Sequence, residues 1–158
     1  MKHPVPQVGP IDDLIEATLQ RAGVRAAASA PEKPRASADP ALDERLTEQL
    51  KKGVAALLDK KAEKLVVLNL QGLTTISDYF VLATAGSDRQ AQALSDAVEL
   101  ALKAAGRRPL SIEGYSSAAW ILLDYGDVVF HVFHDEARRF YGLERLWGDA
   151  PDATAAFR

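Results

Sequence analysis

Two histidines and a neighbouring carboxylate come nearest to a metal-binding pattern in this sequence. His131 and His134 are three positions apart, and Asp135 follows directly. Imidazole and carboxylate groups are common zinc ligands, but a zinc site needs at least three protein ligands. Positions 131 and 134 fall at the end of a predicted strand, where side chains three residues apart point to opposite faces. We therefore expect no metal site, and we interpret His131 as a half-buried residue of a sheet.

A second candidate for chemistry is the turn Gly86-Ser87-Asp88, which precedes a predicted helix. The amino end of a helix attracts anions, and enzymes that transfer nucleotides use a Gly-Ser turn at this place. Such enzymes also need clustered carboxylates to hold Mg²⁺. Asp124 and Asp127 flank a predicted tight turn, where carboxylates ordinarily accept hydrogen bonds from the turn.

Other catalytic motifs are missing from the sequence. It contains no P-loop, no G-x-S-x-G motif and no G-x-G-x-x-G motif. Ser116 and Ser117 lie in a predicted loop with no suitably spaced base. We find no catalytic set, and we expect neither a cofactor nor a metal ion.

The carboxylates and histidines are positioned by a predicted β-hairpin. Residues 119–124 (AWILLD) and 127–133 (DVVFHVF) are rich in β-branched and aromatic side chains, and only Tyr125-Gly126 separates them. Gly126 can adopt a positive φ without steric cost, so it can close the turn. The sequence does not decide between two types of connection, a two-residue turn and a three-residue loop with a glycine bulge.

Both faces of the first hairpin strand are apolar. Trp120, Leu122 and Asp124 point one way, whereas Ala119, Ile121 and Leu123 point the other. A strand of this kind is buried on both sides, or it carries an exposed patch that a partner covers. Trp120 is therefore either a core residue or the centre of a binding surface, and the residues alone do not decide between them.

The remaining elements surround this hairpin. We predict a helix from Pro40, with Asp39 as its N-cap, to about Lys61, and then strands over 64–71 and 79–85. A second helix has Ser87 or Asp88 as its N-cap and ends before Gly106. A strand over 109–113, the hairpin, and a helical segment over 135–147 complete the order. This order predicts an α/β fold with a mixed sheet and with helices mostly on one side.

The chain divides into three parts by composition. Its 158 residues, 47% of them hydrophobic, suffice for one domain, which we place at 41–150. Residues 1–40 form an extension with a possible helix at 11–22 and a linker rich in alanine, serine and proline. That helix is either a docking element or too short to be stable alone. Residues 151–158 form a C-terminal tail.

Charge and composition limit the classes of partner. The net charge is −3, and the excess of acid, 17 acidic against 14 basic side chains, lies in residues 41–158. This charge suits a basic protein partner and disfavours binding of nucleic acid through its phosphates. The chain has no cysteine, no apolar run long enough to span a bilayer, and no pattern of a signal peptide. We expect a cytoplasmic protein without membrane contact.

Five ordered blocks of this sequence resemble one known family, the ribosomal silencing factors, also called the Iojap family. Together the blocks cover roughly residues 42–150. They are 77–81 (SDYFV), 87–90 (SDRQ), 113–114 (EG), 120–133 (WILLDYGDVVFHVF, apart from position 130) and 138–147 (RRFYGLERLW). The chain departs from the family pattern at Asn69 and at 74–76 (TTI), and many members lack the first 40 residues.

The resemblance implies both a fold and a role. The fold is an α/β domain with a nucleotidyltransferase-like arrangement that has lost its catalytic carboxylates. The role is that of a translational repressor, which binds the large ribosomal subunit through its ribosomal protein number fourteen. By occupying that site it sterically blocks joining of the small subunit when nutrients are scarce, and family members can form a homodimer. The alternative is a nucleotidyltransferase-type enzyme.

The resemblance and the hairpin together predict a partner-binding surface. Trp120 is expected to contribute a large share of the affinity, because a buried interface tryptophan commonly accounts for about 2 kcal/mol or more of binding energy. The surface also includes Leu122, Asp124, Tyr125 and Asp127 beside it, with Glu113 and Tyr115 on the rim.

Overall fold

The computed structural model of the protein describes residues 40–73 and 77–158. The predicted helix at 11–22, the linker after it, the N-cap at Asp39 and the departure at 74–76 all lie outside the described residues. Among the described helices, none has the length and apolarity that crossing a bilayer requires.

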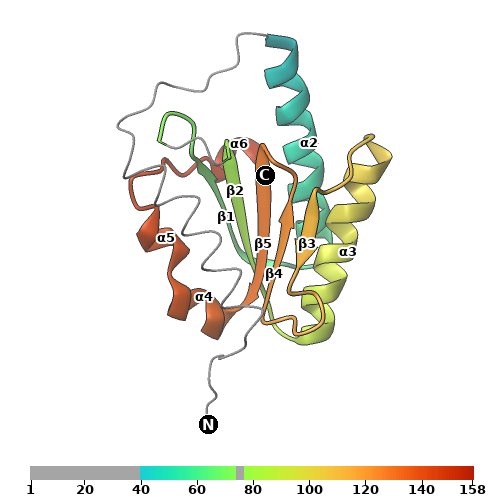
Figure 1. Ribbon diagram of the computed structural model, residues 1–158, viewed down its shortest axis with the longest axis vertical. Helices are drawn as coiled ribbons and strands as arrows, with labels where there is room; N and C mark the ends of the chain where they lie inside the picture. The colour runs from blue at the N-terminus through green and yellow to red at the C-terminus, as the bar shows by residue number, and fades with distance from the viewer. Residues whose placement is uncertain (1–39, 74–76) are drawn as a thin grey trace.

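A mixed five-stranded sheet forms the centre of the domain, as predicted (Figure 1). The strands lie in the order β1-β2-β5-β4-β3. β2 and β5 run parallel, and the other neighbouring pairs run antiparallel. The strands are β1 (Glu63–Asn69), β2 (Tyr79–Ala85), β3 (Ser111–Glu113), β4 (Trp120–Asp124) and β5 (Val128–His134). The α/β fold class is confirmed.

The hairpin of β4 and β5 is present, but its reversal lies one residue later than expected. Trp120 pairs with Phe133, and the register continues to Asp124 opposite Val129. The Tyr125 N–H donates to the Val128 carbonyl at 2.9 Å, so Gly126 and Asp127 form the connection. Gly126 has φ +90°. A positive φ at the first of two connecting residues is the pattern of a type II′ turn.

Helices cover both faces of the sheet (Figure 1). α2 (Pro40–Asp59) and α3 (Asp88–Ala104) lie on one face, and α4 (Asp135–Tyr141) and α5 (Leu143–Leu146) lie on the other. The two long helices share one face and the two short helices cover the other, so the expectation of helices mostly on one side is confirmed. The strands β2, β4 and β5 are apolar on both faces, so each face must be shielded from water.

Each face of the sheet has its own hydrophobic core. The core under α2 and α3 includes Leu50, Val54, Leu57, Val81, Leu94, Val98, Ile121, Leu123, Phe130 and Val132. The core under α4 and α5 includes Phe80, Leu82, Trp120, Leu122, Phe133, Leu143 and Trp147.

Local signals determine where α3 and the last helices begin and end. The Ser87 side chain accepts a hydrogen bond from the Gln90 N–H at 3.0 Å, which confirms Ser87 as the N-cap. Gly106, with φ +88°, follows the end of α3, as predicted. Gly142, with φ +57°, separates α4 from α5, so the predicted helical segment over 135–147 is interrupted there.

Residues 151–158 pack against the edge strand β1. The Ala153 N–H donates to the Val67 carbonyl at 2.7 Å, and the Thr154 hydroxyl accepts from the Val67 N–H at 2.9 Å. α6 (Thr154–Phe157) then buries Phe157, whose ring lies edge-on to Tyr79 with centroids 5.5 Å apart. The segment that the sequence places outside the domain therefore shields one edge of the sheet.

Candidate partner-binding surface

Trp120 lies in the core between the sheet and α4. It is 0% exposed, and its ring packs against Phe133 and Tyr141 with centroids 5.4 and 5.3 Å away. Its indole N–H donates to Nδ1 of His131 at 3.0 Å. The interpretation of Trp120 as an exposed residue awaiting a partner is therefore wrong, and the core interpretation is confirmed. The physical reason is that the last helices cover the face on which Trp120 lies.

His131 is more deeply buried than expected. It is 0% exposed, and burial lowers its pKa to about 3, with a smaller contribution from the positive charge of Arg138. Its Nδ1 accepts the hydrogen bond from the Trp120 indole N–H, so the neutral ring carries its own proton on Nε2. Within the described part of the chain, nothing accepts a hydrogen bond from that Nε2 atom. His131 therefore acts as a neutral acceptor inside the core.

His134 points to the other face of the sheet, as the spacing predicted. Its Nε2 lies 2.8 Å from Asp88 Oδ1 at the start of α3. The two histidines thus have different surroundings and cannot share a ligand. In residues 40–73 and 77–158, no three histidine, cysteine or acidic side chains are grouped so that they could hold a metal ion.

Three further residues of the predicted surface are also buried. Leu122, Asp124 and Tyr125 are 3%, 7% and 3% exposed. Asp124 accepts a hydrogen bond from the Gly126 N–H at 2.8 Å, so it stabilises the turn as expected of a flanking carboxylate. Burial raises the pKa of Tyr125 to about 12. In this conformation these residues hold the hairpin together and offer little surface to a partner.

Arg107 fixes the end of the hairpin to the helices. Its guanidinium donates to both carboxylate oxygens of Asp127, at 3.0 and 3.3 Å, and to the Tyr125 carbonyl at 2.8 Å. It also donates to Gln49 of α2 at 2.7 Å and lies 5.6 Å from the centroid of the Tyr125 ring. Asp127 is partly exposed, but its carboxylate already has this partner. The one local signal for this contact is a basic residue directly after Gly106.

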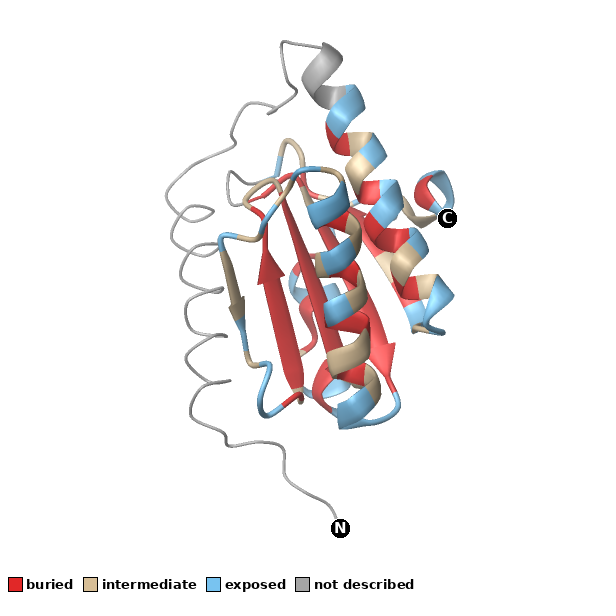
Figure 2. Ribbon diagram, turned by 90° about the vertical axis from the view of Figure 1, so that its right-hand side faces the viewer, coloured by how far each residue is buried: buried red, intermediate tan, exposed pale blue. Residues whose placement is uncertain are grey.

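The exposed part of the predicted set lies along the edge strand β3. Glu113 and Tyr115 are exposed, and the neighbouring Leu110 is 74% exposed. Figure 2 shows β3 as a partly exposed strand at the edge of the sheet, beside fully buried inner strands. On α3, which borders this edge, Leu100 is 69% exposed. We call Leu100, Leu110, Glu113 and Tyr115 the α3–β3 surface.

Tyr115 is held against α3 by two hydrogen bonds. Its hydroxyl donates to the Asp96 carboxylate at 3.0 Å, and its carbonyl accepts from the Gln92 side chain at 2.9 Å. The hydrogen bond to Asp96 raises the pKa of Tyr115, and the negative charges of Asp96 and Glu99 add to the effect. The α3–β3 surface therefore combines exposed apolar side chains with acidic ones.

Comparison with known proteins agrees with this fold. The family described as "Ribosomal silencing factor during starvation" matches residues 43–157. The chain belongs to this family. The match extends through the residues of α6, which pack on β1.

Several known relatives align with most of the folded part of the chain. The chain is 44% identical over 104 residues to "Ribosomal silencing factor RsfS" of Halalkalibacterium halodurans, which covers 66% of this chain and 89% of the relative. It is 42% identical over 108 residues to the protein of that name in Bacillus subtilis, covering 68% and 92%. "Protein Iojap, chloroplastic" of Arabidopsis thaliana is 37% identical over 100 residues, covering 63% of this chain and 41% of that protein.

Solved structures of similar proteins share the architecture. A crystal structure of a Chromobacterium violaceum protein superposes with a TM-score of 0.63 at 39% identity, covering 64% of this chain and 84% of that one. A crystal structure of a Bacillus halodurans protein gives a TM-score of 0.58 at 41% identity, covering 63% and 93%. The family is one of ribosome-associated regulators, so the site to be sought on this chain is a binding surface.

Proposed function

We propose that this protein binds the large ribosomal subunit through its ribosomal protein number fourteen and sterically blocks joining of the small subunit. Translation is thereby lowered under nutrient limitation, in the cytoplasm where subunits join. The protein performs no reaction. The observation that carries this proposal is the α3–β3 surface, an exposed apolar edge with acidic neighbours on a chain that belongs to the ribosomal silencing factor family.

The composition of the α3–β3 surface suits a basic protein partner. Leu100, Leu110 and Tyr115 supply apolar area that is exposed in the free chain. Glu113, Asp96 and Glu99 supply negative charge around it. Apolar contacts at the centre of an interface give most of the affinity, whereas surrounding charges steer association and select the partner. Acidic charge also opposes the approach of small-subunit RNA.

The buried members of the predicted set support this surface from inside. Leu122 of β4 pairs with Glu113 of β3, so the position of the edge strand depends on β4. Trp120 in turn fixes β4 against β5 and α4. We therefore assign Trp120, Leu122, Asp124, Tyr125 and Asp127 to positioning of the surface, and Glu113 and Tyr115 to direct contact.

The alternative, a nucleotidyltransferase-type enzyme, receives less support from the site. Such an enzyme needs carboxylates that are free to hold Mg²⁺. Asp124 accepts a hydrogen bond from the turn, and Asp127 is bound by Arg107. Calorimetry with nucleoside triphosphates and Mg²⁺, followed by an assay for nucleotide transfer, separates the two functions.

The test of the surface uses Leu110→Asp with Leu146→Asp as its matched control. Both leucines are exposed, Leu110 at 74% and Leu146 at 49%, and Leu146 lies on α5. Co-sedimentation with purified large subunits should show at least about tenfold weaker binding for Leu110→Asp and little change for Leu146→Asp. If Leu146→Asp were the damaging change, the partner would bind the α4–α5 side instead. If the unaltered protein did not bind large subunits, the proposed function would be wrong.

Steric blocking of subunit joining also predicts how inhibition depends on the concentration of the protein. In a light-scattering assay with purified subunits, joined ribosomes should fall as the protein is titrated to equivalence with large subunits. Excess small subunits should restore joining by mass action. Progressive loss at substoichiometric protein, or loss that persists after the protein is washed off, would instead indicate a chemical modification of the ribosome.

A further inference from the structure

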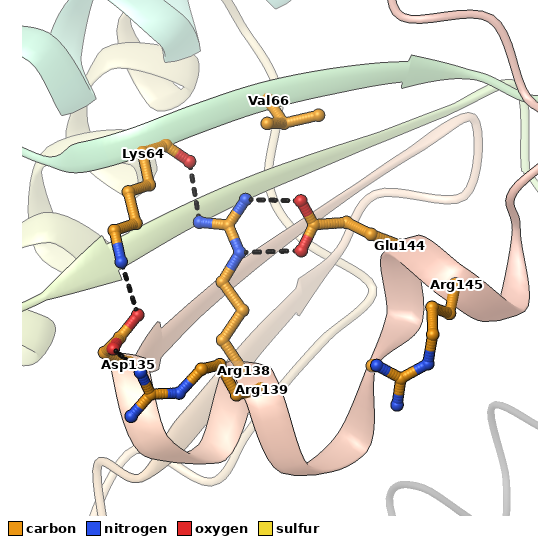
Figure 3. A pocket seen from close by; sticks show the side chains of 8 residues that line it. Lys64, Val66, Asp135, Arg138, Arg139, Glu144 and Arg145 are labelled. Atoms are coloured by element: carbon orange, nitrogen blue, oxygen red, sulfur yellow. Dashed lines mark hydrogen bonds and ion pairs between the residues drawn. The ribbon is translucent and has the colours of Figure 1, made fainter.

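A polar groove lies between the start of β1 and the last helices (Figure 3). These helices cover the side of the sheet opposite α2 and α3 (Figure 1). The groove has a volume of about 490 Å³, within the range of sites for small molecules. It is lined by Lys64, Val66, Asp135, Arg138, Arg139, Gly142, Glu144 and Arg145. The proposed ribosomal role does not use this groove.

Arg138 and Glu144 form an ion pair at the centre of the groove, and this pair has no net charge. Arg138 is 5% exposed, and its guanidinium donates to both carboxylate oxygens of Glu144, at 3.0 and 3.1 Å. It also donates to the Lys64 carbonyl at 2.6 Å and to the Thr84 hydroxyl at 2.8 Å. These contacts join β1, β2, α4 and α5, and they leave Arg138 nearly saturated. Arg138 thus positions the groove and has little capacity left for a ligand.

The other cations of the groove are incompletely neutralised. Lys64 and Arg139 share one carboxylate, Asp135, at 2.8 and 3.1 Å. The hydrogen bond from Lys64 lowers the pKa of Asp135, so this carboxylate stays ionised at neutral pH. Among the residues that the structure describes, none forms a hydrogen bond or ion pair with the Arg145 guanidinium. Four cations and two carboxylates give the groove a net charge of +2, opposite in sign to the whole chain.

The cations occupy both ends of the groove. Figure 3 shows Lys64, Asp135 and Arg139 at one end and Arg145 at the other, with the pair of Arg138 and Glu144 between them. Gly142 gives Arg145 the room to lie there. A Cβ atom at position 142 would be 2.6 Å from Arg145 Nη2 and 2.9 Å from its Cζ. The side chains of Lys64 and Arg139 are 59% and 71% exposed, so they can turn toward a ligand without stranding a buried charge.

We propose that this groove binds a small anion that carries two or more linked phosphates, such as a nucleoside di- or triphosphate. A chain of phosphates can contact the cations at both ends, and its negative charge complements the net positive charge of the groove. A single carboxylate would neutralise only half of that excess. Arginine and lysine are the ordinary phosphate-binding side chains, and contacts to charged groups are stronger than neutral hydrogen bonds.

Calorimetry on the full-length protein tests this proposal with two probes, sodium tripolyphosphate and ATP. Both are titrated without Mg²⁺, in low salt and in a buffer free of phosphate. We expect saturable binding with one site per chain, weakened by added salt. Arg145→Glu should weaken it at least about tenfold. The control is Arg45→Glu, which makes the same charge change at an exposed position on α2, on the other face of the sheet. It should change affinity less than about twofold.

Three results would overturn the proposal. One is the absence of saturable binding of both probes. Another is equal weakening by Arg145→Glu and Arg45→Glu, which would show that only net charge matters. The third is binding of a short single-stranded RNA but of neither probe, which would make the groove a contact for an RNA backbone. Because these measurements contain no ribosomes, their outcome is independent of the test with Leu110→Asp.

Discussion

Trp120→Ala should unfold the domain more readily, because Trp120 is fully buried against Phe133 and Tyr141. Truncation of a buried aromatic residue costs about 3 to 5 kcal/mol. The lost indole N–H also leaves Nδ1 of His131 buried without its donor. At about 4 °C per kcal/mol for a domain of this size, the melting temperature should fall by roughly 10 to 20 °C. Circular dichroism during thermal and urea unfolding measures both quantities.

A second variant isolates the hydrogen bond from the packing. Trp120→Phe removes the donor but retains much of the ring, so its cost should be smaller than that of Trp120→Ala. Replacement of His131 by leucine in the same chain removes the orphaned acceptor and should recover part of that cost. The coupling energy of the double-mutant cycle measures the contribution of the pair. Phe140→Ala is the control, because Phe140 is 63% exposed and its truncation should cost less than about 0.5 kcal/mol.

Binding decides whether Trp120 also contacts the partner. The folded fraction of Trp120→Ala should bind large subunits within about threefold of the unaltered protein once affinity is corrected for unfolding. The core assignment would be refuted if Trp120→Ala kept its stability within about 1 kcal/mol and lost binding about thirtyfold or more.

Two further predictions concern His131 and Arg107. The pKa of His131 is about 3 in the folded chain and about 6.5 when unfolded, so only the unfolded chain takes up this proton between those pH values. The free energy of unfolding should therefore fall by about 1.4 kcal/mol per pH unit as the pH drops below about 6. His131→Leu should remove this one-proton contribution to the pH dependence, which urea unfolding at several pH values measures. Arg107→Ala should lower the free energy of unfolding by about 1 kcal/mol, since its pair with Asp127 is partly exposed. Arg107→Lys should recover only part of this stability, because lysine lacks the bidentate geometry. Full stability of both Arg107 variants would show that the turn holds without this contact.

The elements that the sequence predicted well are those with local causes. β2 begins and ends where expected, and the start and end of α3 follow from Ser87 and Gly106. The side of the sheet on which each helix packs has no local cause. It depends on contacts between distant segments, as when Ala153 pairs with Val67, and these contacts leave no periodic pattern in the sequence.

The burial of the candidate site residues was predicted only in part for the same reason. A strand that is apolar on both faces predicts burial and an exposed patch equally, and only the placement of α4 and α5 decides between them. Glu113 at the end of the short edge strand and Tyr115 in the loop after it are exposed, and their contact with a partner stays a prediction. Arg107 was missed, since its bond to Asp127 joins residues 20 positions apart.

The burial of the hairpin changes how loss of function in this chain should be interpreted. The shape of the α3–β3 surface depends on β4, which positions β3 through the pairing of Leu122 with Glu113. A change at Trp120 or Leu122 can therefore weaken binding without removing any contact with the partner, because it lowers the population of the folded surface. A change at Leu110 should leave that population unaltered and weaken binding directly, since the side chain is mostly exposed. Comparison of affinity with stability for both kinds of variant is thus the measurement that separates the surface from its support.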